Sequence, residues 1–281
     1  MQRLVKAWRK TRVERAKEGN EVRVYLFKES PLVAKLSSPM QFHGLGNMIY
    51  TNAAGDDEEV KKALHVWKIA IDKLAASGHG WGTFAYADAL SKGEGTRKNE
   101  KKAFELYKHC AESGIPPAYM NVANMYTSGT GTDKNEAEAL RWLMKAAEAG
   151  DPSAKSRLGE YYALGKGGVQ KDRARAVQYY KEAATAGIIT AQFNLGYMYL
   201  TGDGVSQDAL QAEALFRKAA EKGFVMAMVN LAQMYRTGYG KVPKDLVTAQ
   251  KWLELAAPHD PNAKELLKVM TEPNPEQVAA Q

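Results

Sequence analysis

The chain has 281 residues, of which 45% are hydrophobic and 25% charged, and this ordinary globular composition excludes disorder over most of its length. No apolar run approaches the roughly 18 residues that a membrane helix needs, and no cleavable secretory signal opens the chain, so we expect a soluble intracellular protein. The single cysteine, Cys110, excludes an internal disulfide and any CxxC motif for metal or redox chemistry.

An N-terminal arm, residues 1–37, holds most of the net charge of +7. Residues 1–36 contain ten Lys or Arg and four Asp or Glu and carry +6, whereas the other 245 residues contain 29 basic and 28 acidic side chains. Clustered basic side chains release counterions from nucleic-acid phosphates, so one interpretation is that the arm binds RNA or an acidic protein. The others are a mitochondrial presequence, despite few serines and early acidic residues, and a solvated tail. The candidate contacts are Arg3, Lys6, Trp8, Arg9, Lys10 and Arg12.

Two series of glycines mark a repeat in the rest of the chain. Gly-x-Gly pairs begin at Gly93, Gly129, Gly165, Gly202 and Gly238, with spacings of 36, 36, 37 and 36 residues. Single glycines at Gly78, Gly114, Gly150, Gly187 and Gly223 have the same spacings. Between these marks apolar residues recur at helical spacing, as in Ala191, Leu195, Met198 and Tyr199. Each period therefore predicts two helices.

The second helix of each period has signals at both ends. Its first residue follows Asn99, Asn135, Asp172, Asp208 or Asp245, whose short side-chain oxygens are suited to accept from the free amides of the first turn. It ends before Gly114, Gly150, Gly187 or Gly223, where a left-handed backbone favours glycine. Small pairs such as Ala183-Ala184 and Ala219-Ala220 predict that neighbouring helices approach closely.

One period carries these elements in full. It contains Ala191, Leu195-Gly196-Tyr197-Met198-Tyr199, Gly202-Asp203-Gly204-Val205, Asp208, Ala212 and Lys218-Ala219-Ala220-Glu221-Lys222-Gly223. This pattern resembles the Sel1-like repeat, a relative of the tetratricopeptide repeat. The resemblance covers about four fifths of the chain and implies an all-α, right-handed α-solenoid of about six helix pairs.

The pattern divides the chain into an arm, repeats, a lone helix and a tail. The arm at 1–37 is followed by repeats at 38–78, 79–114, 115–150, 151–187, 188–223 and 224–260, a helix at 261–271 and a tail at 272–281. The first of these repeats is degenerate. We expect the lone helix to cover the open apolar end of the stack.

The residues that usually carry chemistry form no motif here. None of the glycine-rich loops fits a P-loop or follows a strand, and the five histidines show no HxxxH or HExxH spacing. Cys110 occupies a position that alanine holds in other repeats, which predicts a packed side chain. We therefore expect no catalytic residues, no metal, no cofactor and no small-molecule substrate.

The first helices offer a candidate binding surface. Asn121, Asn194 and Asn230 are repeat equivalents, and asparagine recurring inside a helix needs a reason. The resemblance implies that first helices line a concave groove, where such amides bind the backbone of a protein ligand. The alternative is hydrogen bonding between adjacent repeats. Arg157 holds the equivalent position in a further repeat, and Asn124, Glu160, Tyr197 and Gln233 complete the candidate surface.

These features predict a non-catalytic scaffold that serves as a structural or assembly component of a larger complex. The basic arm favours an organellar RNA–protein assembly such as a mitochondrial ribosome, and hence a mitochondrial location. The alternative is a cytoplasmic or signalling adaptor that binds extended peptides in its groove.

Overall fold

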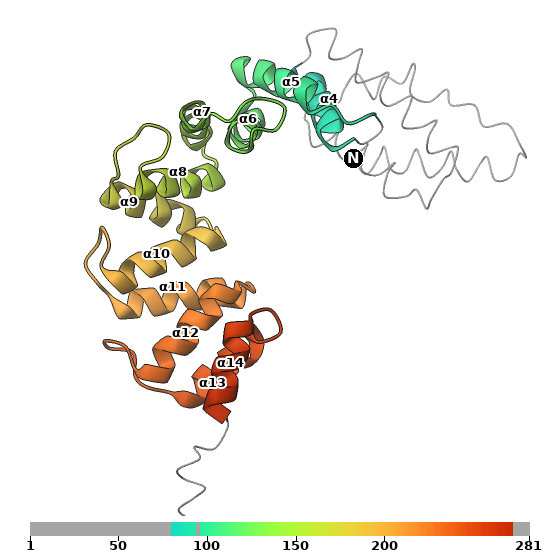
Figure 1. The fold of residues 1–281 in the computed structure, drawn as a ribbon. Helices are drawn as coiled ribbons and strands as arrows, with labels where there is room; N and C mark the ends of the chain where they lie inside the picture. The colour runs from blue at the N-terminus through green and yellow to red at the C-terminus, as the bar shows by residue number, and fades with distance from the viewer. Residues whose placement is uncertain (1–79, 94–95, 272–281) are drawn as a thin grey trace, which may run out of the picture. The chain divides into compact units, whose positions relative to one another are not determined.

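The computed structural model describes residues 80–93 and 96–271, which form eleven α-helices and no strand apart from an isolated bridge between Tyr239 and Val242. The helices, shown in Figure 1, are α4 (Gly80–Lys92), α5 (Glu100–Glu112), α6 (Pro116–Ser128), α7 (Glu136–Glu148), α8 (Pro152–Leu164), α9 (Arg173–Thr185), α10 (Ile189–Thr201), α11 (Ala209–Glu221), α12 (Val225–Thr237), α13 (Leu246–Ala256) and α14 (Pro261–Thr271). The arm, the degenerate repeat at 38–78 and the tail at 272–281 lie outside the described residues. Two helices per period, and with them the all-α solenoid fold, are confirmed.

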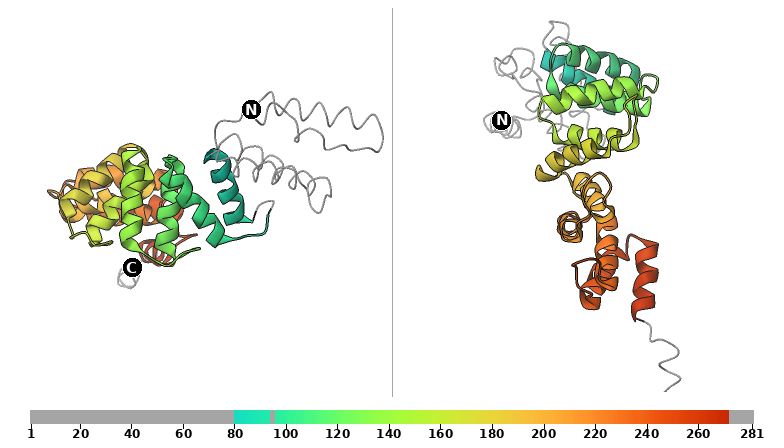
Figure 2. Two further views of the ribbon diagram at one scale, coloured as in Figure 1. Left: turned by 90° about the horizontal axis from the view of Figure 1, so that it is seen from above. Right: turned by 90° about the vertical axis from the view of Figure 1, so that its left-hand side faces the viewer.

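The chain divides into two compact units, Met1–Trp142 and Leu143–Gln281, with the boundary inside α7. In the first unit, α5 packs against both α4 and α6. In the second unit, every helix from α8 to α14 packs against the next one along the chain, and this succession can be followed in Figure 2. Helices therefore bury their apolar faces mainly against their neighbours in sequence, as in other repeat proteins.

The second helices begin at the residues that the sequence indicates. The side-chain oxygens of Asn99, Asn135, Asp172, Asp208 and Asp245 each accept a hydrogen bond from the backbone amide three residues later, at 2.9 to 3.1 Å. Each bond satisfies a donor that the first helical turn leaves without an intrahelical partner. The predicted N-caps are confirmed.

The second helices also end as predicted. At the end of α9, Gly187 has a φ of +88°, its amide donates to the carbonyl of Ala184, and the amide of Ile188 donates to that of Ala183. This pair of bonds is the Schellman motif, which needs a left-handed residue that glycine adopts without a Cβ clash. The same bonds follow α5, α7 and α11, where the closing glycines are Gly114, Gly150 and Gly223.

The second glycine of the Gly-x-Gly loops is needed for a different reason, which is a close contact with another backbone. A Cβ on Gly204 would lie 2.5 Å from the backbone carbonyl carbon of Arg173, at the start of the second helix of the preceding repeat. Gly131 lies as closely against the backbone of Glu100, one repeat earlier in the first unit. The loop of one repeat therefore rests on the helix start of the previous one, and a side chain would separate them.

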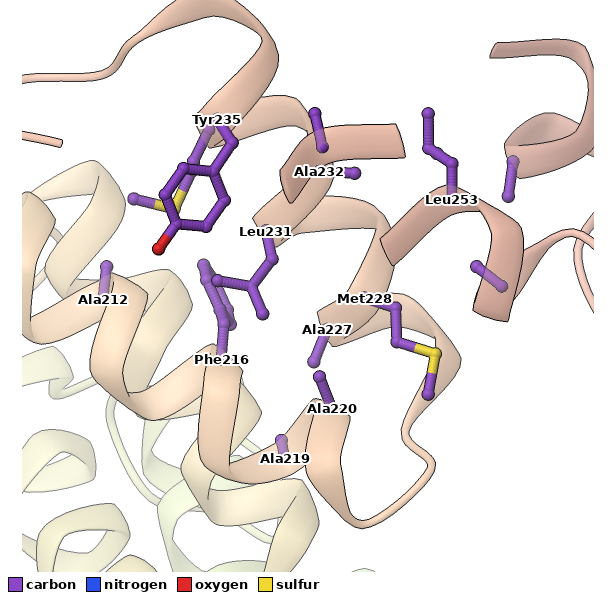
Figure 3. Close-up of a cluster of buried hydrophobic side chains, with 14 of the residues drawn as sticks. Ala212, Phe216, Ala219, Ala220, Ala227, Met228, Leu231, Ala232, Tyr235 and Leu253 are labelled. Atoms are coloured by element: carbon purple, nitrogen blue, oxygen red, sulfur yellow. The ribbon is translucent and has the colours of Figure 1, made fainter. Parts of the chain in front are cut away.

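Glycines inside two first helices make room for rings. A Cβ on Gly159 of α8 would lie 2.7 Å from the ring of Tyr180, and one on Gly196 of α10 would lie 2.9 Å from the ring of Phe216. Phe216 is fully buried in the cluster that Figure 3 shows, with Leu231 of α12. The Leu-Gly element of the repeat thus allows a large side chain of the second helix to pack directly on the backbone of the first.

The last helix, α14, differs from the first helices on its outer side. Ala263 is fully buried, and Leu267 and Met270 pack against the core cluster of the preceding repeat. In α12, Met228, Ala232 and Tyr235 are buried. The positions 36 residues later, on α14, hold the exposed side chains of Lys264, Lys268 and Thr271. The apolar side of α14 is covered and its outer side is polar, which is the composition of a solenoid cap.

Candidate protein-binding site

Six of the predicted site residues lie in the second unit, two on each first helix. We call these residues the first-helix face: Arg157 and Glu160 on α8, Asn194 and Tyr197 on α10, and Asn230 and Gln233 on α12. The two members of each pair are three residues apart, so their side chains leave the same side of the helix. Tyr197 is 51% exposed, which is unusual for a large aromatic side chain in a packed helix. Asn121 and Asn124 lie on α6 in the first unit.

The two equivalent asparagines of this face make different contacts. The side chain of Asn194 is hydrogen-bonded to the hydroxyl of Tyr180, which belongs to the preceding repeat. The amide nitrogen of Asn230 instead donates to the carbonyl oxygen of Met226 in its own helix, at 2.8 Å. The residue equivalent to Tyr180 there is Phe216, which offers no hydroxyl. Hydrogen bonding between adjacent repeats, the alternative from the sequence, is therefore present at Asn194, while binding by these amides stays a prediction.

Tyr180 lies beneath the first-helix face and its hydroxyl is held neutral. Burial raises the pKa of Tyr180 to about 12, the Glu160 carboxylate adds to this rise, and the hydrogen bond with Asn194 opposes it. Its side chain is only 3% exposed. The hydroxyl is thus a structural contact between α9 and α10 and not a surface group.

Charge on the face is concentrated on α8. The carboxylate of Glu160 accepts a hydrogen bond from Nζ of Lys166 at 2.6 Å, and both side chains are partly exposed. Further along, Oε1 of Gln233 accepts from Nε of Arg236 at 3.2 Å. The face therefore changes from charged side chains on α8 to amides and an aromatic ring on α10 and α12.

A pocket of about 420 Å³ opens between α8, α10 and the start of α12. It is lined by Ser156, Arg157, Glu160, Thr190, Phe193, Asn194, Phe224 and Met226. Three of these residues, on α8 and α10, belong to the predicted face. The other five were not predicted as site residues, although Ser156 carries a signal: the equivalent positions of the other described repeats hold Phe84, Met120, Phe193 and Val229.

A second hollow lies at the start of α9 and has a volume of about 510 Å³. Two of its cations are already paired. Nε of Arg173 lies 3.2 Å from Oδ2 of Asp203, and the guanidinium of Arg175 lies 4.4 Å from the centre of the Tyr162 ring. These contacts fasten a loop of the repeat to its neighbours, and we assign no ligand to this hollow.

Chemically reactive groups outside the face are buried or isolated. Cys110 is fully buried, its Sγ lies 3.4 Å from the carbonyl oxygen of Gly80, and burial raises its pKa to about 12. Among residues 80–93 and 96–271 there is no cluster of three side chains that could ligate a metal. No helix in that part of the chain is long and apolar enough to cross a membrane. The arm candidates Arg3, Lys6, Trp8, Arg9, Lys10 and Arg12 lie outside the described residues.

Comparisons with known proteins agree with the geometry of the repeats. The family model described as Sel1 repeat matches residues 82–114, 116–151, 152–188, 189–224 and 225–257. No curated protein matches the chain. A Sel1 repeat protein from Oxalobacter formigenes is 30% identical, with a TM-score of 0.65 over 82% of this chain and 88% of that one. A protective antigen of uropathogenic Escherichia coli strains, displaying an SLR fold, is 26% identical with a TM-score of 0.74 over 88% of this chain; the chain spans 51% of that protein's length. The five matched repeats show that the chain belongs to the Sel1 repeat family.

Proposed function

We propose that this chain is a non-catalytic scaffold that binds partner proteins along the first-helix face of its second unit. The observation that carries the proposal is the composition of that face, which offers an exposed aromatic ring, amides and a charged pair beside an open pocket. Exposed aromatic and arginine side chains are the residue types that most often anchor protein interfaces. Membership of a helical-repeat family supports the same function, since stacked repeats present extended surfaces to partners.

Tyr197 gives the most direct test, because its side chain is exposed and is not part of the core. Replacing it with the photo-reactive residue p-benzoylphenylalanine should cross-link the chain to a small, reproducible set of proteins in its native cells. The matched control is the same replacement at Leu210, which is 48% exposed on a second helix. Cross-links that are identical from both positions, or absent from Tyr197, would reject the first-helix face as the binding surface.

Substitution of the exposed side chains should then weaken the cross-linked complex without loss of helicity. Tyr197→Ala combined with Gln233→Ala is better suited than removal of the asparagines, because Asn194 also bonds to Tyr180 within the fold. The control is Leu210→Ala. Equal affinity of both variants for the identified partner would contradict the proposal.

The finer proposal is that the partner is an organellar RNA–protein assembly such as a mitochondrial ribosome. It is supported only by the +6 charge of residues 1–36 beside a nearly neutral remainder. Counterion release predicts that log affinity falls linearly with log salt concentration. Glutamine at Arg3, Lys6, Arg9, Lys10 and Arg12 should flatten that slope, and Trp8→Ala should weaken binding further if the ring stacks on a base. A complex that survives nuclease and deletion of residues 1–20 would favour the alternative, an adaptor that binds extended peptides.

A further inference from the structure

The register of the first-helix face continues onto α14, the helix that ends the stack. Leu266 and Val269 lie 36 residues after Asn230 and Gln233, the two members of the face on α12. The buried sides of the two helices correspond as well, because Ala263 of α14 and the alanine 36 residues before it are both fully buried. The side chains of Leu266 and Val269 therefore extend the face by one helix, although neither was predicted as a site residue.

The exposed apolar side chains of the face lie toward this end. Val269 is 65% exposed and Tyr197 of α10 is 51% exposed. Met226, one turn before Asn230 on the same side of α12, is 53% exposed. On α8, by contrast, the residue in the register of Tyr197 is Glu160. Large apolar side chains exposed on the same side of three first helices indicate a binding surface.

The same part of the face carries no charged side chain. On α10, α12 and α14, the positions that share this side are Thr190, Asn194, Tyr197, Met226, Asn230, Gln233, Asn262, Leu266 and Val269, and none of them is Asp, Glu, Lys or Arg. Arg236 lies at the border, where its Nε donates to Oε1 of Gln233. A charged group of a partner that was buried on this surface would lose its hydration and gain no ion pair. The surface therefore favours a partner that is uncharged where it covers these helices.

Two side-chain amides on α12 have atoms left for a partner. Nδ2 of Asn230 donates to the carbonyl oxygen of Met226, and Oε1 of Gln233 accepts from Arg236. Within residues 80–93 and 96–271, Oδ1 of Asn230 and Nε2 of Gln233 have no hydrogen-bond partner. One acceptor and one donor match the N–H and C=O groups of an extended backbone, since a helix already bonds these groups internally.

We propose that α10, α12 and α14 bind an extended, uncharged segment of a partner protein, with an aliphatic side chain of that segment seated on Leu266 and Val269. The amides of Asn230 and Gln233 bind the backbone of the segment, and the ring of Tyr197 contacts its other end. This inference rests on the proposed function and specifies the chemistry of the partner.

Peptide selection on the full chain tests the inference. Random twelve-residue peptides displayed on phage are selected in about 0.5 M salt, which screens attraction to exposed charges. The enriched peptides are synthesised with a fluorescent label and titrated by fluorescence polarisation. We expect them to share an uncharged stretch with at least one Leu, Ile, Val or Met. Val269→Lys should weaken their binding by about tenfold or more, because an apolar contact is replaced by a charge that must be desolvated. Val269→Ser, which adds no charge, should weaken it to a smaller degree.

Leu255→Lys is the matched control. Leu255 is 57% exposed on α13 and, like Val269 on α14, lies in the last turn of its helix, so both variants place a lysine at an exposed helix end. Its affinity should stay within about twofold of that of the unmodified chain. Equal binding by the two lysine variants, enrichment of acidic or basic peptides, or no enrichment would overturn the inference.

Tyr197→Ala separates this inference from the proposed function. If Tyr197→Ala weakens peptide binding and Val269→Lys does not, the first-helix face binds partners but α14 takes no part, and only the present inference fails. If neither variant weakens binding of the enriched peptides, the peptides bind elsewhere on the chain and both proposals fail for them. Loss of binding in both variants, with normal binding by Leu255→Lys, is the expected result.

Discussion

The repeats at 151–187 and 188–223 pack their two helices together in the same way but with different side chains. In both, a glycine of the first helix faces a ring of the second: Gly159 faces Tyr180, and Gly196 faces Phe216. This close contact is the same because it sets the distance between paired helices. What differs is the neighbouring position on the first helix, where Ser156 in one repeat corresponds to Phe193 in the other.

The hydrogen bonds of the two repeats differ as well. Tyr180 has a hydroxyl, and Asn194 of the following repeat bonds to it, whereas Asn230 bonds within its own helix beside Phe216. Residues that hold paired helices together therefore change as pairs, while the position of Ser156 and Phe193 on the first helix varies from repeat to repeat. Ser156, at one such variable position, lines the pocket of about 420 Å³ between α8, α10 and the start of α12.

Removal of a shared ring should have the largest effect on stability. Phe216 is fully buried between α10 and α12, so Phe216→Ala should lower the free energy of unfolding by about 3 to 5 kcal/mol. Urea denaturation followed by circular dichroism would measure it, with the exposed Lys218→Ala as the control, expected within about 0.5 kcal/mol. A loss as small as that of the control would mean that the ring is not the contact that holds the two helices.

The glycine opposite the ring should show the next largest effect. Gly196→Ala places a Cβ 2.9 Å from the ring of Phe216, and we expect a loss of about 1 to 3 kcal/mol. Ala232 in α12 and Leu253 in α13 hold the equivalent positions of the next repeat, and both are buried in the same cluster (Figure 3). The double variant Gly196→Ala with Phe216→Leu should therefore lose less than the two single losses added together, in the same urea experiment. If the losses in unfolding free energy of the two single variants simply add, the close contact between Gly196 and the Phe216 ring does not determine stability.

Alkaline pH should distinguish the two rings. The pKa of Tyr180 is about 12 in the folded chain and ordinarily 10 when unfolded, so above pH 10 the unfolded state loses its proton first. Stability then falls between pH 10 and pH 12 by about 1.4 kcal/mol per pH unit for this group and is unaffected below that range. Tyr180→Phe should make this alkaline decline shallower. Identical declines in the two proteins would show that the hydroxyl is not held neutral by the fold.

The smallest expected effect is that of the hydroxyl at neutral pH. Tyr180→Phe makes the first repeat resemble the second and removes the bond with Asn194, with an expected loss of about 0.5 to 1.5 kcal/mol at pH 7. Adding Asn194→Ala to this variant should lower the free energy of unfolding by little more, because the Tyr180 hydroxyl to which Asn194 bonds has already been removed. A large further loss would give Asn194 a second role in the fold.

The ends of the second helices could be predicted because their causes lie within a few residues. Asp172 accepts from an amide three residues later, and Gly187 closes a bond to a carbonyl three residues earlier, so the local sequence contains both partners. The repeat spacing then extends each such inference to the other periods. The number and order of helices in the described residues followed from this glycine spacing together with the apolar residues at helical spacing between the glycines.

The pocket and the asparagine contacts could not be predicted in the same way. Asn194 and Asn230 look equivalent in the sequence, and their contacts differ because a residue on another helix is Tyr180 in one case and Phe216 in the other. The pocket is lined by side chains of α8 and α10 together with Phe224 and Met226 at the start of α12, so its lining comes from three repeats. The available signal in the sequence was Ser156, a polar residue at a position that is apolar in the other described repeats. This signal indicates where a pocket could lie but not which residues line it.

The polar side of α14 also bears on self-assembly. A helical stack is a one-dimensional structure, and an apolar end face would bind any matching end face, so that separate molecules would add to one another like monomers to a filament. On α14 that surface carries Lys264 and Lys268 instead of the methionine and alanine found in α12. Two molecules that met through this face would bring like charges together at close range. Pairing of two molecules through their α14 faces is therefore unfavourable.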